Sequence, residues 1–160
     1  MSDTKKGDIV TPNSADQIGA ILFACNINAV RSAMAETMVK DAFPGKIFVD
    51  SCGVTPGIQD GFATAVMQEI DLDMSAHWPK SFDDLDSGFY DVIISFSSEA
   101  HAAAEALTRN MDCATFYWPV DNLANLTGSR EEMLRAYRHV RDDIRHKLSI
   151  YFGKPISGNT

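Results

Sequence analysis

The sequence predicts an α/β fold: a single domain built on an open four-stranded parallel sheet with helices on both faces. Short apolar runs alternate along the chain with longer segments of helical periodicity, which is typical of such a sheet. The length of 160 residues suits one domain. Neither an internal repeat nor a shift in composition divides the chain, so we expect no second domain.

The first strand and the first helix are the elements on which the candidate site depends. Residues 20–24, Ala-Ile-Leu-Phe-Ala, form a continuous apolar run typical of a strand buried on both faces. After a polar loop, Met34 and Met38 follow at helical spacing, and Pro44 with Gly45 ends the predicted helix.

The same alternation continues along the rest of the chain. The last helix has the clearest signal, because Ser129 and Glu132 form a capping-box pair and apolar residues then recur at intervals of three and four. The further elements are strands at residues 47–49, 90–96 and 114–117, and helices around residues 62–70 and 99–107.

We expect the domain to occupy residues 19–153, with a flexible polar N-terminal tail at 1–18 and a C-terminal tail at 154–160. The N-terminal segment lacks the apolar stretch of a signal peptide. No apolar run approaches the roughly 20 residues that a membrane helix needs. These observations favour a cytoplasmic protein with no membrane partner.

The net charge and the cysteine content limit the classes of function that this protein can have. A formal net charge of −8 argues against nucleic acid as a partner, because phosphate backbones are bound by lysine and arginine. It leaves room for one phosphate group held by local backbone dipoles. Three cysteines without a Cys-x-x-Cys pair form neither a disulfide framework nor a zinc signature, and they suit a reducing compartment. The four histidines have no metal-binding spacing, so we expect no metal and no cofactor.

The loop after the first strand carries the predicted chemistry. Residues 25–32 read Cys-Asn-Ile-Asn-Ala-Val-Arg-Ser, at the carboxyl end of a strand, where open α/β sheets bind ligands. Backbone N–H groups of such a loop can converge on an anion, assisted by the positive end of the following helix. Cys25 is a candidate nucleophile, and Arg31 can bind two oxygens of a tetrahedral oxyanion. Ser32 can donate to the sulfur or cap the helix. The alternative is that Cys25 is only a small buried apolar residue.

The stretch from Ile21 to Glu36 resembles the signature of the low-molecular-weight protein tyrosine phosphatases and of the arsenate reductases that share their fold. In that family the loop reads Cys-x-x-Asn-x-x-Arg-Ser, followed by Met-Ala-Glu. Residues 50–53 (Asp-Ser-Cys-Gly) and 73–77 (Asp-Met-Ser-Ala-His) resemble its Ser-Ala-Gly and Asp-x-Ser-x-His, so the resemblance covers about residues 20–150. The residues that match the loop signature are Cys25, Asn28, Arg31, Ser32, Met34, Ala35 and Glu36.

The resemblance implies a phosphatase I-like fold and a phosphomonoester hydrolase of the protein tyrosine phosphatase type. Cys25 would attack phosphorus to form a phosphocysteine, Arg31 would stabilise the oxyanion, and an aspartate after the fourth strand would protonate the leaving oxygen. The implied ligand is phosphate or another tetrahedral oxyanion, and a phosphoprotein is a candidate substrate. Asn28 would also brace the loop. The expected binding residues are Asn26, Ile27, Asn28, Ala29, Val30 and Ser32.

The sequence departs from the family pattern at the acid. Where the family has Asp-Pro, residues 121–123 read Asp-Asn-Leu, and we predict Asp121 as the acid. A shift of one residue in the loop would put Asn122 there instead, and an amide cannot donate the proton. The tyrosines that often follow in the family are missing. Tyr117 or Trp118 is an alternative wall of the site, although burial at a strand end is the favoured interpretation for both.

Two further positions differ from the pattern. Ile27 replaces the usual glycine, and a β-branched residue disfavours positive φ, so we expect a strained or differently shaped loop. Cys52 follows the second strand and is expected at the same sheet edge as Cys25, as a redox partner or a buried structural thiol. Cys113 begins the fourth strand and is expected at the opposite edge.

Two alternative functions stay open. An arsenate reductase would use Cys25 to attack arsenate and a second thiol to resolve the adduct. Cys52 is the candidate for that thiol, unless another molecule supplies it. A degenerate regulatory module would bind phosphate through Cys25 and Arg31 without an acid.

Overall fold

The computed structural model describes residues 18–85 and 89–156, and this part of the chain contains one four-stranded sheet. Its strands are β1 (Ala20–Cys25), β2 (Phe48–Gly53), β3 (Val92–Ser95) and β4 (Ala114–Tyr117), in the order β2-β1-β3-β4. Every neighbouring pair is parallel, which confirms the predicted open parallel sheet. Most of the two predicted tails lies outside the described residues.

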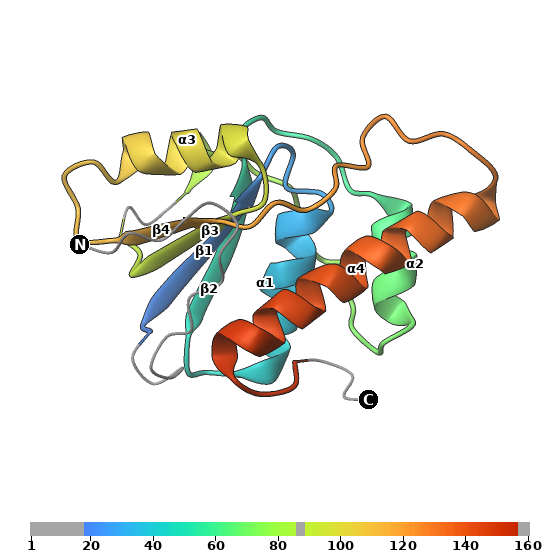
Figure 1. Ribbon diagram of the computed structural model, residues 1–160, viewed down its shortest axis with the longest axis horizontal. Coiled ribbons are helices and arrows are strands. Elements are labelled where there is room, and N and C mark those ends of the chain that lie inside the picture. Colours follow the sequence, from blue (N-terminus) through green and yellow to red (C-terminus); the bar gives the residue numbers. More distant parts are fainter. Residues whose placement is uncertain (1–17, 86–88, 157–160) are drawn as a thin grey trace.

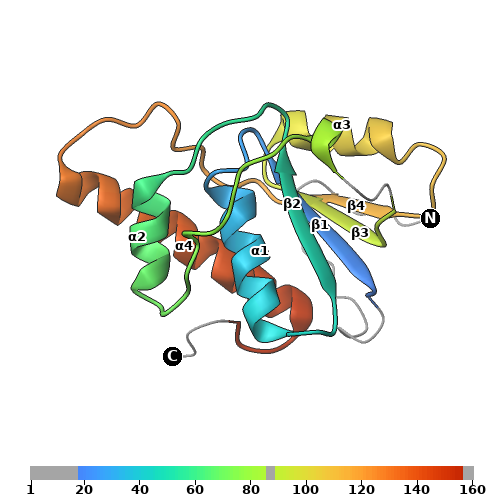
Figure 2. The same ribbon diagram turned by 180° about the vertical axis from the view of Figure 1, so that it is seen from behind.

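Helices cover both faces of the sheet, as predicted (Figure 1). On one face, α3 (Ser98–Leu107) packs against β1, β3 and β4. On the other, α1 (Arg31–Ala42) packs against β1 and β2, and α4 (Arg130–Phe152) crosses α1. Figure 2 shows from behind that α2 (Gly61–Gln68) packs on α4 away from the sheet. None of the helices within the described residues is both long and apolar enough to cross a bilayer.

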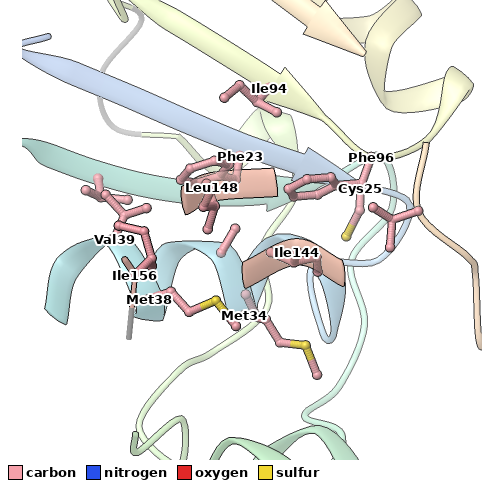
Figure 3. Close-up of a cluster of buried hydrophobic side chains, with 14 of the residues drawn as sticks. Phe23, Cys25, Met34, Met38, Val39, Ile94, Phe96, Ile144, Leu148 and Ile156 are labelled. Carbon is pink, nitrogen blue, oxygen red and sulfur yellow. The ribbon is translucent and has the colours of Figure 1, made fainter. Parts of the chain in front are cut away.

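The main hydrophobic core lies between the sheet and the helices α1 and α4 (Figure 3). Phe23 of β1, Met34 and Met38 of α1, and Ile144 of α4 meet there and are all fully buried. Burying an apolar side chain of this size stabilises the fold by about 1.5–3 kcal/mol. This layer therefore fixes α1 against β1, and with them the loop that joins the two elements.

A smaller core fills the opposite face, beneath α3. Successive side chains of a strand point to opposite faces of the sheet. Ile21, Phe23 and Cys25 of β1 accordingly belong to the main core, whereas Leu22 and Ala24 belong to the smaller one. The same cluster contains Cys52, Tyr90, Ile93, Ala100 and Ala104.

Two strand boundaries differ from the sequence prediction. β2 continues to Gly53 because the polar side chains in its second half, Asp50 and Ser51, are buried and hydrogen-bonded. β3 covers four residues, and Tyr90 and Phe96 lie just outside it. The capping box of α4 is confirmed: Glu132 N donates to Ser129 Oγ at 3.1 Å, and Ser129 N donates to Glu132 Oε1 at 2.8 Å.

Candidate active site

Cys25 is the last residue of β1, and its thiol lies at the base of the loop that leads into α1. Ser32 Oγ lies 2.9 Å from Cys25 Sγ, and the backbone N–H of Ser32 donates to the same sulfur at 3.4 Å. The N-cap residue of α1 is Val30, which makes no side-chain capping bond. Of the two predicted roles of Ser32, the contact with the sulfur is confirmed and the helix cap is wrong.

Asn28 braces the loop from inside. Its Nδ2 donates to Ser32 Oγ at 2.8 Å and to Ser51 Oγ at 2.9 Å, and its Oδ1 accepts from Lys80 N at 3.0 Å. The side chain is fully buried, and φ is +31°, on the positive side where asparagine is enriched among non-glycine residues. These bonds confirm the predicted bracing role of Asn28.

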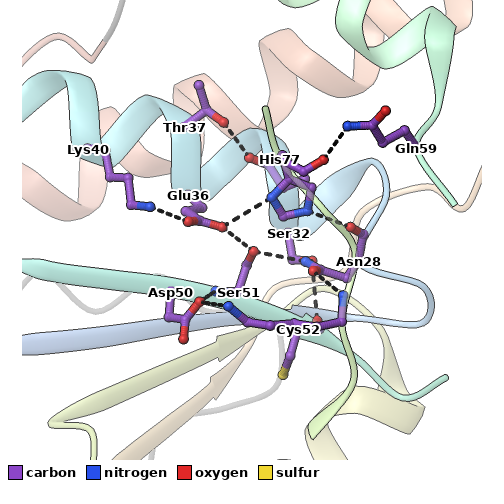
Figure 4. A network of polar contacts seen from close by, with 12 residues as sticks. Asn28, Ser32, Glu36, Thr37, Lys40, Asp50, Ser51, Cys52, Gln59 and His77 are labelled. Carbon is purple, nitrogen blue, oxygen red and sulfur yellow. Dashed lines mark hydrogen bonds and ion pairs between the residues drawn. The ribbon is translucent and has the colours of Figure 1, made fainter. Parts of the chain in front are cut away.

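A polar network continues from Asn28 along the side of α1 that faces β2 (Figure 4). Ser51 Oγ donates to Glu36 Oε1, and the other oxygen of Glu36 pairs with Lys40. His77 Nε2 lies 2.9 Å from the carbonyl oxygen of Asn28, and His77 Nδ1 lies 3.6 Å from Glu36 Oε1. Unpaired buried polar groups are costly, so this network favours one conformation of the loop over others.

The end of β2 supports the loop from below. A Cβ atom on Gly53 would lie 2.7 Å from the backbone nitrogen of Asn28, so this position requires glycine. Lys80 Nζ pairs with Asp50 Oδ1 at 2.5 Å. Partial burial alone would lower the pKa of Lys80, but the hydrogen bond and charge of Asp50 outweigh it and raise that pKa above its ordinary value. The chain segment that contacts Asn28 is thereby tied to β2.

Arg31 is nearly buried, and backbone carbonyls fix its guanidinium. Its Nη1 donates to the carbonyl oxygens of Phe96 at 3.1 Å and Val120 at 3.0 Å, which follow β3 and β4. Arginine carries five N–H donors. Within the described residues no hydrogen bond occupies those on Nε and Nη2, so they are available to an oxyanion in the loop.

A cavity of about 480 Å³ opens beside Cys25. Its walls come from the loop after β2, the loop after β4, and α4. The predicted binding residues Asn28 and Ser32 do not line it, because they are fully buried beneath its floor. The loop residues that do line it are Cys25, Asn26, Ile27, Ala29, Val30 and Arg31.

Asp121 and Asn122 occupy different positions relative to this cavity. Asn122 lines the cavity beside Cys25, whereas Asp121 lines a neighbouring cavity of about 290 Å³. The two cavities share Asn26, Arg31 and Asn122. Asn122 Oδ1 accepts from Ala124 N at 3.0 Å, which stabilises the turn of this loop. The acid role of Asp121 stays a prediction.

Tyr137 of α4 is the aromatic residue among those that line the cavity beside Cys25. Trp118 is fully buried, as favoured from the sequence, and Tyr117 lines the neighbouring cavity. Ile27 does not adopt positive φ, so the strain expected from its backbone is absent. Its side chain instead packs next to Gly57, where an added Cβ would lie 2.1 Å from Ile27 Cγ2.

The three cysteines lie in different chemical environments. Cys52 pairs in register with Ala24 and belongs to the core under α3, on the opposite face of the sheet from Cys25. Burial, and then the nearby Cys25 and Asp50, raise the pKa of the Cys52 thiol far above its ordinary value. Cys113 precedes β4 at the opposite sheet edge, and burial with neighbouring aspartates raises its pKa to about 11.

Three members of the polar network, Glu36, Ser51 and His77, have no role that can be derived from the sequence. The sequence feature that could have identified these three residues is that each lies within a segment that resembles the family motifs. Their mutual contacts join α1, β2 and the loop before η2 (Phe82–Asp84), which are distant along the chain. Among the described residues, no three His, Cys, Asp or Glu side chains gather as they would around a metal ion.

A cysteine at the end of the first strand of a parallel sheet, a tight loop and a buried arginine at the start of the following helix form an arrangement that is suited to binding an oxyanion. The chain belongs to the low molecular weight phosphotyrosine protein phosphatase family, whose sequence pattern matches residues 20–154.

Two relatives are named as arsenate reductases. The glutaredoxin arsenate reductase of Synechocystis is 36% identical over 75 residues, which cover 47% of this chain and 57% of the relative, so the match spans little more than half of that protein. The arsenate reductase of Halalkalibacterium halodurans is 27% identical over 131 residues, covering 82% of this chain and 93% of the relative.

Solved structures of both kinds are similar to this one. The tyrosine phosphatase AmsI of Erwinia amylovora superposes with a TM-score of 0.70 at 16% identity, covering 86% of this chain and 93% of its own. An arsenate reductase in its phosphate-binding state superposes with a TM-score of 0.68 at 25% identity, covering 86% and 98%. At 16% identity, the similarity to AmsI shows only that the two proteins share a fold.

Proposed function

We propose that this protein is a phosphomonoester hydrolase that acts through a phosphocysteine on Cys25. The supporting observation is the arrangement of one loop: Ser32 holds the sulfur of Cys25 at 2.9 Å, and Arg31 is fixed at the start of the next helix. A similar solved structure is an arsenate reductase in its phosphate-binding state, which supports an oxyanion ligand for this protein. Chemistry that needs a reduced cysteine suits the cytoplasm.

The reaction has two steps. The thiolate of Cys25 attacks phosphorus, the bond from phosphorus to the leaving oxygen breaks, and Asp121 donates a proton to that oxygen. Water then attacks the phosphocysteine, Asp121 accepts its proton, and phosphate leaves while the thiolate is restored. Arg31 and the backbone N–H groups of the loop stabilise the negative charge in both transition states.

A second candidate function is arsenate reduction, which the names of two relatives favour. Here Cys25 would attack arsenate and release water. A second thiol would then attack the Cys25 sulfur. A disulfide forms as the sulfur–arsenic bond breaks, and the electron pair of that bond stays on arsenic, so that As(V) leaves as arsenite. Cys52 points to the other face of the sheet and Cys113 lies at the other edge, so this second thiol would come from another molecule.

A third candidate is a phosphate-binding module that has lost its acid. It is favoured by the position of Asn122, which lines the cavity beside Cys25 where Asp121 does not. Such a protein would bind phosphate through Arg31 and the loop without turning over phosphomonoesters.

A paired assay on the pure protein separates the three candidates. Hydrolysis of nitrophenyl phosphate is measured beside arsenate reduction with glutathione, glutaredoxin or thioredoxin as the thiol source. We expect hydrolysis that is lost in Cys25→Ser and falls about 10²–10³-fold in Arg31→Ala, the scale for removal of an oxyanion donor. Cys113→Ser serves as the control and keeps wild-type turnover.

The alternative outcomes are distinct. Thiol-dependent arsenite production with negligible hydrolysis would replace the phosphatase by the reductase. Phosphate binding without either reaction would identify the binding module. Near wild-type hydrolysis in Cys25→Ser would show that Cys25 is not the nucleophile.

A further inference from the structure

The cavity beside Cys25 carries opposite charges on its floor and its wall. Its floor contains Arg31, and its wall contains Asp60, the residue that caps α2. These are the two formally charged residues among those that line it. The volume of about 480 Å³ is far larger than a phosphate group needs, so the wall faces the remainder of a bound substrate.

Asp60 is held rigidly in this wall. Its Oδ1 accepts from Phe62 N at 2.9 Å and from Ala63 N at 3.2 Å, and its Oδ2 accepts from Tyr137 Oη at 2.7 Å. All three partners donate, so the carboxyl serves as an acceptor. A carboxylate offers about four acceptor sites, and one therefore remains for a donor in the cavity.

The charge of Asp60 is not neutralised by a neighbouring cation. Arg138 and Arg141 of α4 pair with Glu69 at the other end of α2. Within the described part of the chain, no lysine, arginine or histidine forms an ion pair with Asp60. Burial, followed by the hydrogen bond and charge of Asp60, raises the pKa of Tyr137, so the phenol stays protonated and keeps donating.

We propose that Asp60 is a specificity-determining residue that selects substrates whose leaving group carries a positively charged group, such as an ammonium, opposite the phosphate. This inference rests on the proposed function, because it assigns the end of the cavity that the leaving group would occupy. Arg31 and the loop bind the phosphate, the aliphatic side chains of Ile27 and Ile58 contact the middle of the leaving group, and Asp60 receives its cation. A carboxylate-bearing leaving group is repelled.

The test uses inert phosphonates, so it does not depend on turnover. Binding of three benzylphosphonates with a 4-aminomethyl, 4-methyl or 4-carboxy group is measured by calorimetry at low and moderate salt. We expect the aminomethyl compound to bind about fivefold more tightly than the methyl compound at low salt, the scale of a partly exposed ion pair. The carboxy compound binds more weakly, and added salt reduces both differences.

The variant Asp60→Asn tests whether the charge of Asp60 causes the preference for the aminomethyl compound. Asparagine caps helices as well as aspartate, so the variant is expected to fold, which its melting temperature checks. It should abolish the preference for the aminomethyl compound and leave the affinity for the methyl compound unchanged. Asp41→Asn, on the exposed face of α1, removes the same charge far from the cavity and should keep the preference.

The outcomes separate the inference from the function. An unchanged preference in Asp60→Asn would overturn the role of Asp60, whatever the turnover. Binding with the expected preference but no hydrolysis of any phosphomonoester would reject the phosphatase function and keep the charge selection. Absence of binding for all three phosphonates would overturn both.

Discussion

Cys25 and Cys52 lie at the ends of neighbouring parallel strands, yet their side chains belong to opposite faces of the sheet. Cys52 pairs in register with Ala24, one residue before Cys25, and each cysteine packs into a different core. Cysteines whose Cβ vectors point apart cannot form a disulfide without backbone movement. Of the two interpretations of Cys52 from sequence, the geometry favours the buried structural thiol.

We therefore predict that mild peroxide oxidises Cys25 without forming a Cys25–Cys52 disulfide. With an added small thiol, Cys25 should form a mixed disulfide, and without one it should proceed to sulfinic acid. Peptide mapping by mass spectrometry under non-reducing conditions measures both products. Cys52→Ala should show the same products as the wild type, and a linked Cys25–Cys52 peptide would contradict this prediction.

Asn28→Ala should weaken both the fold and the phosphate site. The change removes three hydrogen bonds and leaves the polar groups of Ser32 and Ser51 with fewer partners, which costs about 1–3 kcal/mol for a buried group. Denaturant unfolding should show this loss, and phosphate should bind more weakly. The exposed Asn110 provides the control, since Asn110→Ala should change neither quantity.

The general acid can be identified by comparing the hydrolysis rates of phosphate esters that have good and poor leaving groups. General acid help contributes about 10²–10⁴-fold and matters most for a poor leaving group. If Asp121 is the acid, Asp121→Asn should slow hydrolysis of alkyl phosphates far more than that of nitrophenyl phosphate, with phosphate affinity largely kept. Asn122→Ala should be mild. Equal rates for Asp121→Asn and wild type, together with a steep dependence on the leaving group, would show that no acid operates.

Ile27 and Gly57 should be energetically coupled. An alanine at position 57 would place its Cβ 2.1 Å from Ile27 Cγ2, and overpacking of this kind costs about 1–3 kcal/mol. Gly57→Ala should lower the free energy of unfolding and the affinity for phosphate. In the double variant Ile27→Ala/Gly57→Ala most of the loss should be recovered, and a double-mutant cycle measures the coupling. Additive effects would show that the loop relaxes without strain.

Glu69 should make the stability of the protein depend on pH in the acid range. Hydrogen bonds from Arg138 and Arg141 lower the pKa of Glu69 below its ordinary value of 4.5. A lowered pKa in the folded state means that the stabilisation is complete above pH 4.5 and is lost as pH falls below it. Because the pair is partly exposed, the effect is at most about 1 kcal/mol.

The corresponding variant is Glu69→Gln. It should be less stable than the wild type at pH 7, and the difference should shrink toward pH 3, as measured by urea unfolding at several pH values. Asp41→Asn provides an exposed control that should show no such convergence. A constant difference across the range would contradict the role of the ion pair.

Local patterns in the sequence are enough to predict the layers of the fold and the composition of the loop. Continuous apolar runs such as residues 20–24 and the capping box at Ser129 are local patterns, and the structure confirms the strand and the helix that they predict. The residues from Cys25 to Ser32 are consecutive, so their convergence at a strand end follows from local geometry. The bracing role of Asn28 was implied by the family resemblance, and the structure identifies its partners as Ser32 and Ser51.

The segments that meet at that loop are distant along the chain, and their meeting depends on the packing of the whole domain. Glu36, Ser51 and His77 come from a helix, a strand and a loop, and no local pattern requires their contact. The face of the sheet toward which the Cys52 side chain points depends on the register between β1 and β2. A shift of one residue in that register would move the side chain to the other face. The opposition of Asp60 to Arg31 likewise depends on how α2 and α4 pack, because Tyr137 of α4 holds the carboxylate in the cavity wall.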